Sequence, residues 1–109
     1  MEKINIIVKL DNKEMPYKYR GEATINKDII EFNDKKDNYI FDKKVQRLIK
    51  SSEESTIMLD FKNKNIKIKE KENELIINIE VKEINISKNN VKIIYIIDKN
   101  EIIFQIKEV

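Results

Sequence analysis

Apolar and polar residues alternate along most of the chain. Residues 3–10, for example, place Ile4, Ile6 and Val8 on one side and mostly charged or amide side chains on the other. Because successive side chains of a strand point to opposite faces, this period of two predicts half-buried β-strands. The segments with this pattern are 3–10, 17–26, 28–33, 38–42, 54–61, 64–69, 74–82, 91–97 and 101–108.

Short polar segments rich in Asn, Asp and Lys separate the predicted strands. Since Asn and Asp tolerate the left-handed backbone conformation, we expect them to form the turns that Gly forms in most proteins. Residues 43–54 permit two interpretations. Val45, Leu48 and Ile49 have helical spacing, whereas residues 44–50 also fit a strand.

A chain of 109 residues with many short antiparallel strands must protect the edges of its sheet. Closure into a barrel removes the edges, and an eight-stranded barrel has room for a filled interior or one small ligand. We therefore expect residues 1–109 to form a single all-β domain, an antiparallel up-and-down meander closed into a small barrel of about eight to ten short strands. No internal repeat is evident in the sequence.

The composition excludes several classes of enzyme. The chain has no Cys and no His, so we expect no thiol nucleophile, no Ser-His-Asp triad and no Cys-ligated metal centre. A single Gly cannot build a Gly-rich phosphate loop. We expect no catalytic residue, no metal and no cofactor, and we interpret the chain as a non-enzyme.

Charge does not single out a partner. Lys and Arg number 22 against 20 Asp and Glu, and carboxylates lie among the lysines. Interspersed charge is typical of soluble surfaces, so we do not expect nucleic acid to bind. The abundance of Ile, Lys and Asn indicates an AT-rich genome.

No segment has the features of a signal peptide or a membrane helix. The N-terminal residues lack a long apolar core, and the longest apolar stretch, 93–97, is much shorter than the ~18 residues that a membrane helix needs. We therefore expect a cytoplasmic protein with no membrane partner.

Aromatic residues on the predicted inner faces define a candidate ligand site. Tyr19, Tyr95 and Phe104 would line the barrel interior, and Arg47 would join them if 44–50 is a strand. An inward Arg could bind a carboxylate or phosphate through two hydrogen bonds. The alternatives are a filled core with the Tyr hydroxyls bonded to backbone, and an Arg47 that packs on apolar surface or pairs with an Asp.

Doubled isoleucines place apolar groups on both faces of several predicted strands. One residue of each pair must face away from the barrel interior. A contiguous patch of such residues would bind a partner or a second copy of the chain, because large apolar patches are uncommon on monomers. The alternative is that these residues are scattered singly over the surface. The candidates for an interface are Ile7, Ile76, Ile94, Ile96 and Ile103.

The order of the predicted elements resembles that of the YwiB-like family, small bacterial proteins of unknown function with a calycin-type (lipocalin-like) β-barrel. The resemblance is carried by Tyr17, Tyr19 and Gly21, by residues 29–32, and by the C-terminal segments 74–79, 91–98 and 102–106. It implies a calycin-like barrel but no chemistry, because fold alone does not imply function.

We interpret the chain as a small β-barrel module for binding or interaction, with an unidentified protein as its partner. One alternative is an intracellular carrier of a small apolar or anionic ligand in the barrel interior. A second alternative is a homodimer that associates through the outer isoleucine face.

Overall fold

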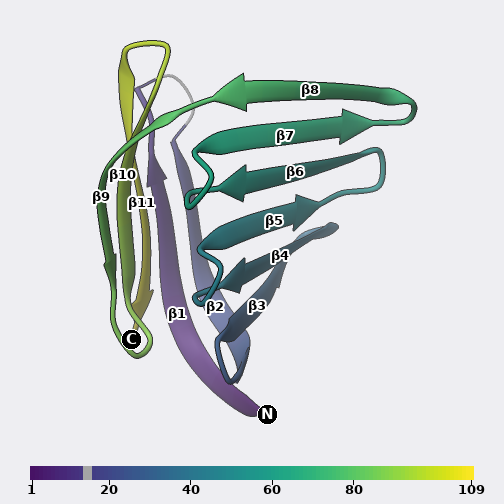
Figure 1. Ribbon diagram of the computed structural model, residues 1–109. Helices are drawn as coiled ribbons and strands as arrows, with labels where there is room; N and C mark the ends of the chain where they lie inside the picture. The colour runs from purple at the N-terminus through teal and green to yellow at the C-terminus, as the bar shows by residue number, and fades with distance from the viewer. Residues whose placement is uncertain (14–15) are drawn as a thin grey trace. The chain divides into compact units, whose positions relative to one another are not determined.

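The computed structural model describes residues 1–13 and 16–109, and this part of the chain contains strands and turns but no helix (Figure 1). The predicted strand 74–82 is divided at Ile79, which adds one strand to those expected from the sequence. The strands are β1 (Glu2–Asp11), β2 (Tyr17–Asn26), β3 (Ile29–Asp34), β4 (Asp37–Asp42), β5 (Arg47–Ser51), β6 (Ser55–Asp60), β7 (Asn65–Glu70), β8 (Asn73–Asn78), β9 (Glu80–Ile86), β10 (Val91–Ile97) and β11 (Asn100–Glu108).

The hydrogen-bonded strand order is β8-β7-β6-β5-β4-β3-β2-β1-β11-β10-β9. The strand β1 pairs antiparallel with β11, from Ile6 opposite Glu108 to Asp11 opposite Ile103. Sequential neighbours combined with a pairing of the first and last strands are the strand order of an up-and-down barrel. The predicted fold class, an all-β antiparallel meander, is therefore confirmed.

The chain forms two compact units. The first, which we call the ladder unit, contains Met1–Lys3 and Ala23–Asn78, and thus β3 to β8 and the end of β2. The second, the terminal unit, contains Ile4–Glu22 and Ile79–Val109, and thus most of β1, the start of β2, and β9 to β11.

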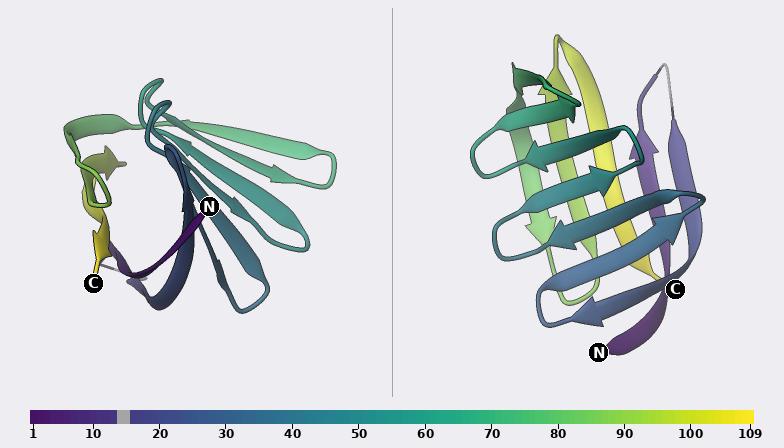
Figure 2. Two further views of the ribbon diagram at one scale, coloured as in Figure 1. Left: turned by 90° about the horizontal axis from the view of Figure 1, so that it is seen from below. Right: turned by 90° about the vertical axis from the view of Figure 1, so that its right-hand side faces the viewer.

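The ladder unit is a series of three similar β-hairpins, β3–β4, β5–β6 and β7–β8 (Figure 2). They begin at Ile29, Arg47 and Asn65, each 18 residues after the one before. This internal repeat was missed in the sequence because equivalent positions share apolar character and not identity. One such position is occupied by Tyr39, Ile57 and Leu75 in turn.

Opposite faces of the ladder unit differ in burial. On the buried face, Phe41, Leu48 and Leu59 lie opposite one another on neighbouring strands, and Phe32 stacks on Tyr39 with ring centroids 4.7 Å apart. Burial on this face declines towards the last hairpin. The other face, which we call the half-exposed face, carries Ile40, Ile49 and Met58 in one row between two rows of mostly polar side chains.

The terminal unit also has a buried apolar face. On β10 and β11 the side chains that are at most 2% exposed are Val91, Ile93, Tyr95, Phe104 and Ile106, and β1 adds further buried residues. The pairing of β9 with β10 is interrupted by a register shift at Ile94 and Tyr95, which marks a β-bulge.

The turns correct two expectations. The helical interpretation of 43–54 is wrong, because β5 runs through the middle of this segment and turns lie on either side of it. Lysines, and not Asn or Asp, occupy most of the left-handed positions. The non-Gly residues with positive φ in the described part of the chain are Lys27, Lys35, Gln46, Lys64, Lys71, Asp98 and Lys99.

Candidate binding surfaces

Two of the candidate ligand residues, Tyr95 and Phe104, lie on the buried face of the terminal unit. Both lie on one face of the β10–β11 pair, since Tyr95 is opposite Ile102 and Phe104 is opposite Ile93. Burial raises the pKa of the Tyr95 phenol far above its ordinary value, so this group stays protonated. Both side chains are at most 2% exposed, as the filled-core alternative requires.

Tyr19 packs along its own strand. Its hydroxyl donates a hydrogen bond of 2.9 Å to the carbonyl oxygen of Glu22. The ring covers Gly21: a Cβ atom added there would lie 2.5 Å from the Tyr19 hydroxyl oxygen and 2.8 Å from Cζ. Gly21 therefore provides space for the ring, and its φ is not positive. The hydroxyl bonds to backbone, which is the alternative considered for the Tyr residues.

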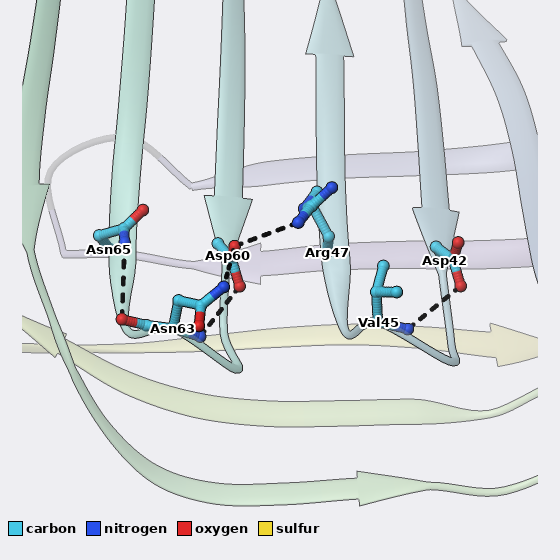
Figure 3. A network of polar contacts seen from close by, with 6 residues as sticks. All are labelled: Asp42, Val45, Arg47, Asp60, Asn63 and Asn65. Atoms are coloured by element: carbon cyan, nitrogen blue, oxygen red, sulfur yellow. Dashed lines mark hydrogen bonds and ion pairs between the residues drawn. The ribbon is translucent and has the colours of Figure 1, made fainter.

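Arg47 lies on the half-exposed face of the ladder unit, opposite Asp60 in the β5–β6 register (Figure 3). Its terminal nitrogen is 3.4 Å from Oδ2 of Asp60. Asp60 also accepts hydrogen bonds from the backbone N–H of Asn63 at 3.0 Å and from the Asn63 side-chain amide at 2.8 Å. Arg47 thus pairs with an Asp, as one interpretation of the sequence allowed, and its guanidinium is engaged in a structural contact.

The carboxylate of Asp60 is held ionised although it is buried. Burial by itself would raise its pKa, but the hydrogen bonds from Asn63 and the charge of Arg47 together lower the pKa below the ordinary value of 3.8. Asp42 has the equivalent position one hairpin earlier, and it accepts hydrogen bonds from the backbone N–H groups of Lys44 and Val45 (Figure 3). These carboxylates hold the turns that connect successive hairpins.

The interface candidates of the terminal unit are only partly contiguous. Ile94 lies directly opposite Ile103, and Ile96 is two residues further along β10, opposite Glu101. Ile7 is opposite Lys107 and so lies away from them. All four are half-buried. The three neighbours form a small apolar cluster beside acidic side chains.

The remaining candidate, Ile76, is on β8 at the end of the ladder unit. Leu75 and Ile76 are 56% and 55% exposed, more than other large apolar side chains within the described strands. Of the described strands, only β7 pairs with β8. Leu75 is on the same face as Ile77, and Ile76 is on the other face between Glu74 and Asn78, so each face of this edge strand carries an apolar side chain.

The strand at the other end of the order, β9, is protected differently. It carries Glu80, Lys82 and Glu83, it takes part in the bulge with β10, and Lys82 is 3.3 Å from the carboxylate of Glu101. Charged side chains and bulges are common protections against pairing at an edge. Within β8 the only charged side chain is Glu74, and its pairing with β7 is regular.

A shallow depression of about 210 Å³ lies on the terminal unit between Asn85, Lys92, Gln105 and Lys107. It is open to solvent and smaller than the roughly 300–1,000 Å³ of ordinary small-molecule sites. The described residues include no cluster of acidic side chains suited to a metal ion. No helix capable of spanning a membrane occurs in the described part of the chain.

No family model, no curated protein and no solved structure matches the chain. The edge of β8 was not singled out by the sequence analysis, which treated Ile76 as one member of an outer face. The signal that could have found it is the 18-residue period, because the last hairpin of a series has no successor to cover its outer strand.

Proposed function

We propose that the chain is a non-enzymatic β-barrel binding module that adds an extended peptide segment to the free edge of β8. The observation that carries the proposal is the exposure of Leu75 and Ile76 on a strand with one hydrogen-bonded neighbour in the described structure. Addition of a strand to an open sheet edge is a common mode of peptide recognition, in which backbone bonds give affinity and side-chain contacts give specificity.

The backbone of β8 is suited to this role. Along an antiparallel strand, residues alternate between those whose N–H and C=O groups bond to the neighbouring strand and those whose groups point away. The two-residue turn between Glu70 and Asn73 makes this pair the bonded one next to the turn. Glu74, Ile76 and Asn78 therefore direct their backbone groups towards the free edge.

The 18-residue hairpin repeat also supports a role for the free edge of β8 in strand pairing. Ile40 of β4 and Met58 of β6 occupy the positions equivalent to Ile76, and they lie opposite Ile49 of β5 and Lys67 of β7. In the first two hairpins this position therefore faces the next antiparallel strand. In β8 the same position is available to a strand from another molecule.

The proposal that the chain is not an enzyme is supported by the lack of His and Cys and by the lowered pKa of the Asp60 carboxylate. A carboxylate whose pKa is lowered by Asn63 and Arg47 is a weak base near neutral pH. Further parts of the proposal are a calycin-type fold like that of the YwiB-like family and a cytoplasmic location. The strand order of an antiparallel meander supports the first of these parts.

The proposal is tested with short peptides of random sequence displayed on phage and selected on the purified protein. Binders are then titrated into 15N-labelled protein. We expect the amide signals of Glu74, Ile76 and Asn78 to shift most, because their N–H groups would gain acceptors.

The variant Ile76→Pro provides the control. Proline removes an outward N–H group and is tolerated on edge strands, so the fold should remain while peptide binding is lost. Ile94→Pro cannot serve as the control for Ile76→Pro, because Ile94 lies on β10, which is paired on both sides. The surface control is Ile94→Lys, which should leave peptide binding unchanged. Binders that shift other amides, or that bind Ile76→Pro equally well, would refute the proposal.

A further inference from the structure

We infer that the segment that pairs with β8 is β8 of a second copy of the chain, antiparallel and with Ile76 opposite Ile76 of the second copy. This inference rests on the proposed function and specifies its partner. It follows from the sequence of β8, whose apolar centre, Leu75-Ile76-Ile77, is flanked by Glu74 and Asn78.

The apolar pattern selects this register. An antiparallel pair forms its hydrogen bonds only in registers where residues whose backbone groups point towards the free edge lie opposite one another. With Ile76 opposite Ile76, Leu75 of each copy lies opposite Ile77 of the other. All six apolar side chains of the two strands then meet apolar neighbours across the new pairing, which is the condition that fixes strand register.

Charge selects the same register. Glu74 would lie opposite Asn78 of the second copy, where the amide can donate to the carboxylate. On its other side Glu74 already lies opposite Lys69 of β7. A shift to Leu75 opposite Leu75 would place Glu74 against Ile76, and a further shift would place Glu74 against Glu74. Like charges directly opposite one another destabilise a pair.

Self-pairing also gives β8 a second hydrogen-bonded neighbour, as the other strands of the ladder unit have. Two ladder units joined through β8 would form one sheet in which every outward group of Glu74, Ile76 and Asn78 has a partner. The contact is isologous, so it closes after two copies and does not propagate. A series of repeats with an uncapped end usually needs such protection.

Cysteine substitution tests the register, because the natural chain contains no Cys. In the inferred pair the Cα atoms of the two residues 76 would be about 5.5 Å apart, within the range of a disulfide. The Cα atoms of the two residues 75 would be about 8 Å apart and those of the two residues 74 about 14 Å apart. We expect Ile76→Cys to form a covalent dimer on mild oxidation, seen as a doubled intact mass. Leu75→Cys and Glu74→Cys should remain single.

A mixture of two cysteine variants provides a positive control for the predicted contact between Glu74 and Asn78 of the second copy. After mild oxidation, Glu74→Cys alone and Asn78→Cys alone should each keep the mass of one chain. When the two variants are mixed, they should form a disulfide between unlike chains. If Leu75→Cys cross-links better than Ile76→Cys, the inferred register is wrong.

Charge substitution tests the dimer without cross-linking. Ile76→Lys and Ile76→Glu should each weaken the dimer by roughly tenfold or more, because like charges would meet at the two-fold axis. An equimolar mixture should restore it as a heterodimer. Both variants keep the backbone N–H group, so they serve if Ile76→Pro does not fold. The measurement is the molecular mass by sedimentation across protein concentrations, with Ile94→Lys as the control that should dimerise normally.

The outcomes separate this inference from the proposed function. If the wild-type chain sediments as a monomer of 13.1 kDa at every concentration while selected peptides still shift the β8 amides, the second copy is wrong and the strand-addition module stands. If the chain dimerises but the Ile76 variants and the cysteines have no effect, the dimer uses another surface and the inference fails. If neither peptides nor a second copy engage β8, both fail.

Discussion

Replacement of Asp60 by Ala should destabilise the ladder unit much more than the same change at Asp42. The two carboxylates occupy equivalent positions at the ends of β6 and β4, and each holds the following turn. They differ in their surroundings. Asp60 is 5% exposed, is bonded by Asn63 through both backbone and side chain, and pairs with Arg47, whereas Asp42 is half-buried and accepts backbone N–H groups only.

The expected magnitudes follow from these contacts. Each hydrogen bond from Asn63 contributes about 1 kcal/mol to stability. The pair with Arg47 adds less than about 1 kcal/mol, because the arginine side chain is 34% exposed and its charge is screened by water. Asp60→Ala should therefore lower the free energy of unfolding by about 2–3 kcal/mol. Asp42→Ala should lower it by about 1 kcal/mol, because its two contacts are a bond of 2.9 Å and a weaker one of 3.3 Å.

Urea unfolding followed by circular dichroism measures both values, and pH provides a second test. The pKa of Asp60 is lowered in the folded protein, so the ionised carboxylate stabilises the fold above the ordinary pKa of 3.8. This contribution is lost as pH falls through the folded-state pKa. The difference in stability between the wild type and Asp60→Asn should therefore be largest near pH 7 and should narrow towards pH 3.

Two results would refute this reasoning. If Asp60→Ala costs no more than Asp42→Ala, the additional contacts of Asp60 contribute nothing. If the difference between the wild type and Asp60→Asn is constant or grows as pH falls, the pKa of Asp60 is not lowered by folding. A double-mutant cycle with Asn63→Ala would then locate the error, because directly bonded residues should show a coupling of about 0.5–3 kcal/mol.

Three further changes have defined outcomes in the same unfolding assay. Gly21→Ala should lower stability by about 1 kcal/mol because the Tyr19 ring must leave its position, and it should become stabilising in a Tyr19→Ala background; an equal effect in both backgrounds would contradict the contact. Lys64→Asn should raise stability by up to about 1 kcal/mol, since Asn tolerates the φ of 60° better than Lys; a loss of stability would contradict this account. Phe104→Ala should cost about 3–5 kcal/mol and Ile103→Ala clearly less, because Phe104 is 1% exposed and Ile103 is half-buried on the opposite face; equal costs would contradict the assignment of faces.

Strand positions could be predicted from the sequence because the alternation of apolar residues is a local property. The segment 17–26 and the segment 91–97 coincide with β2 and β10, and most other boundaries differ by one or two residues. The break at Ile79 was missed because the alternation runs through it without a change of period. Ile77 before the break and Val81 after it continue the same alternation, so the sequence gives no signal of a change in direction.

Pairing was less predictable than strand position. The contact between Arg47 and Asp60 depends on the β5–β6 register. This register could not be predicted, because the sequence of residues 43–54 fitted both a helix and a strand. The left-handed lysines could not be predicted from composition, because the length of each turn between consecutive strands determines which residue takes positive φ. Residues such as Lys64 and Lys71 occupy these positions although Asn is available nearby.

The pairing of β1 with β11 has a consequence for synthesis on the ribosome. The strands β3 to β8 pair only with strands close in sequence, so each hairpin can form within microseconds of leaving the exit tunnel. The residues of β1 are made first, but their partner is made last: Ile6 waits for Glu108. At translation rates of ~5–20 residues per second this delay is roughly 5–20 s. During that time one edge of β1 has no strand partner, and a chaperone that binds extended chains would bind there. Pulse-chase capture of stalled nascent chains, with and without β11, would reveal this interval, and equal chaperone binding to both would argue against it.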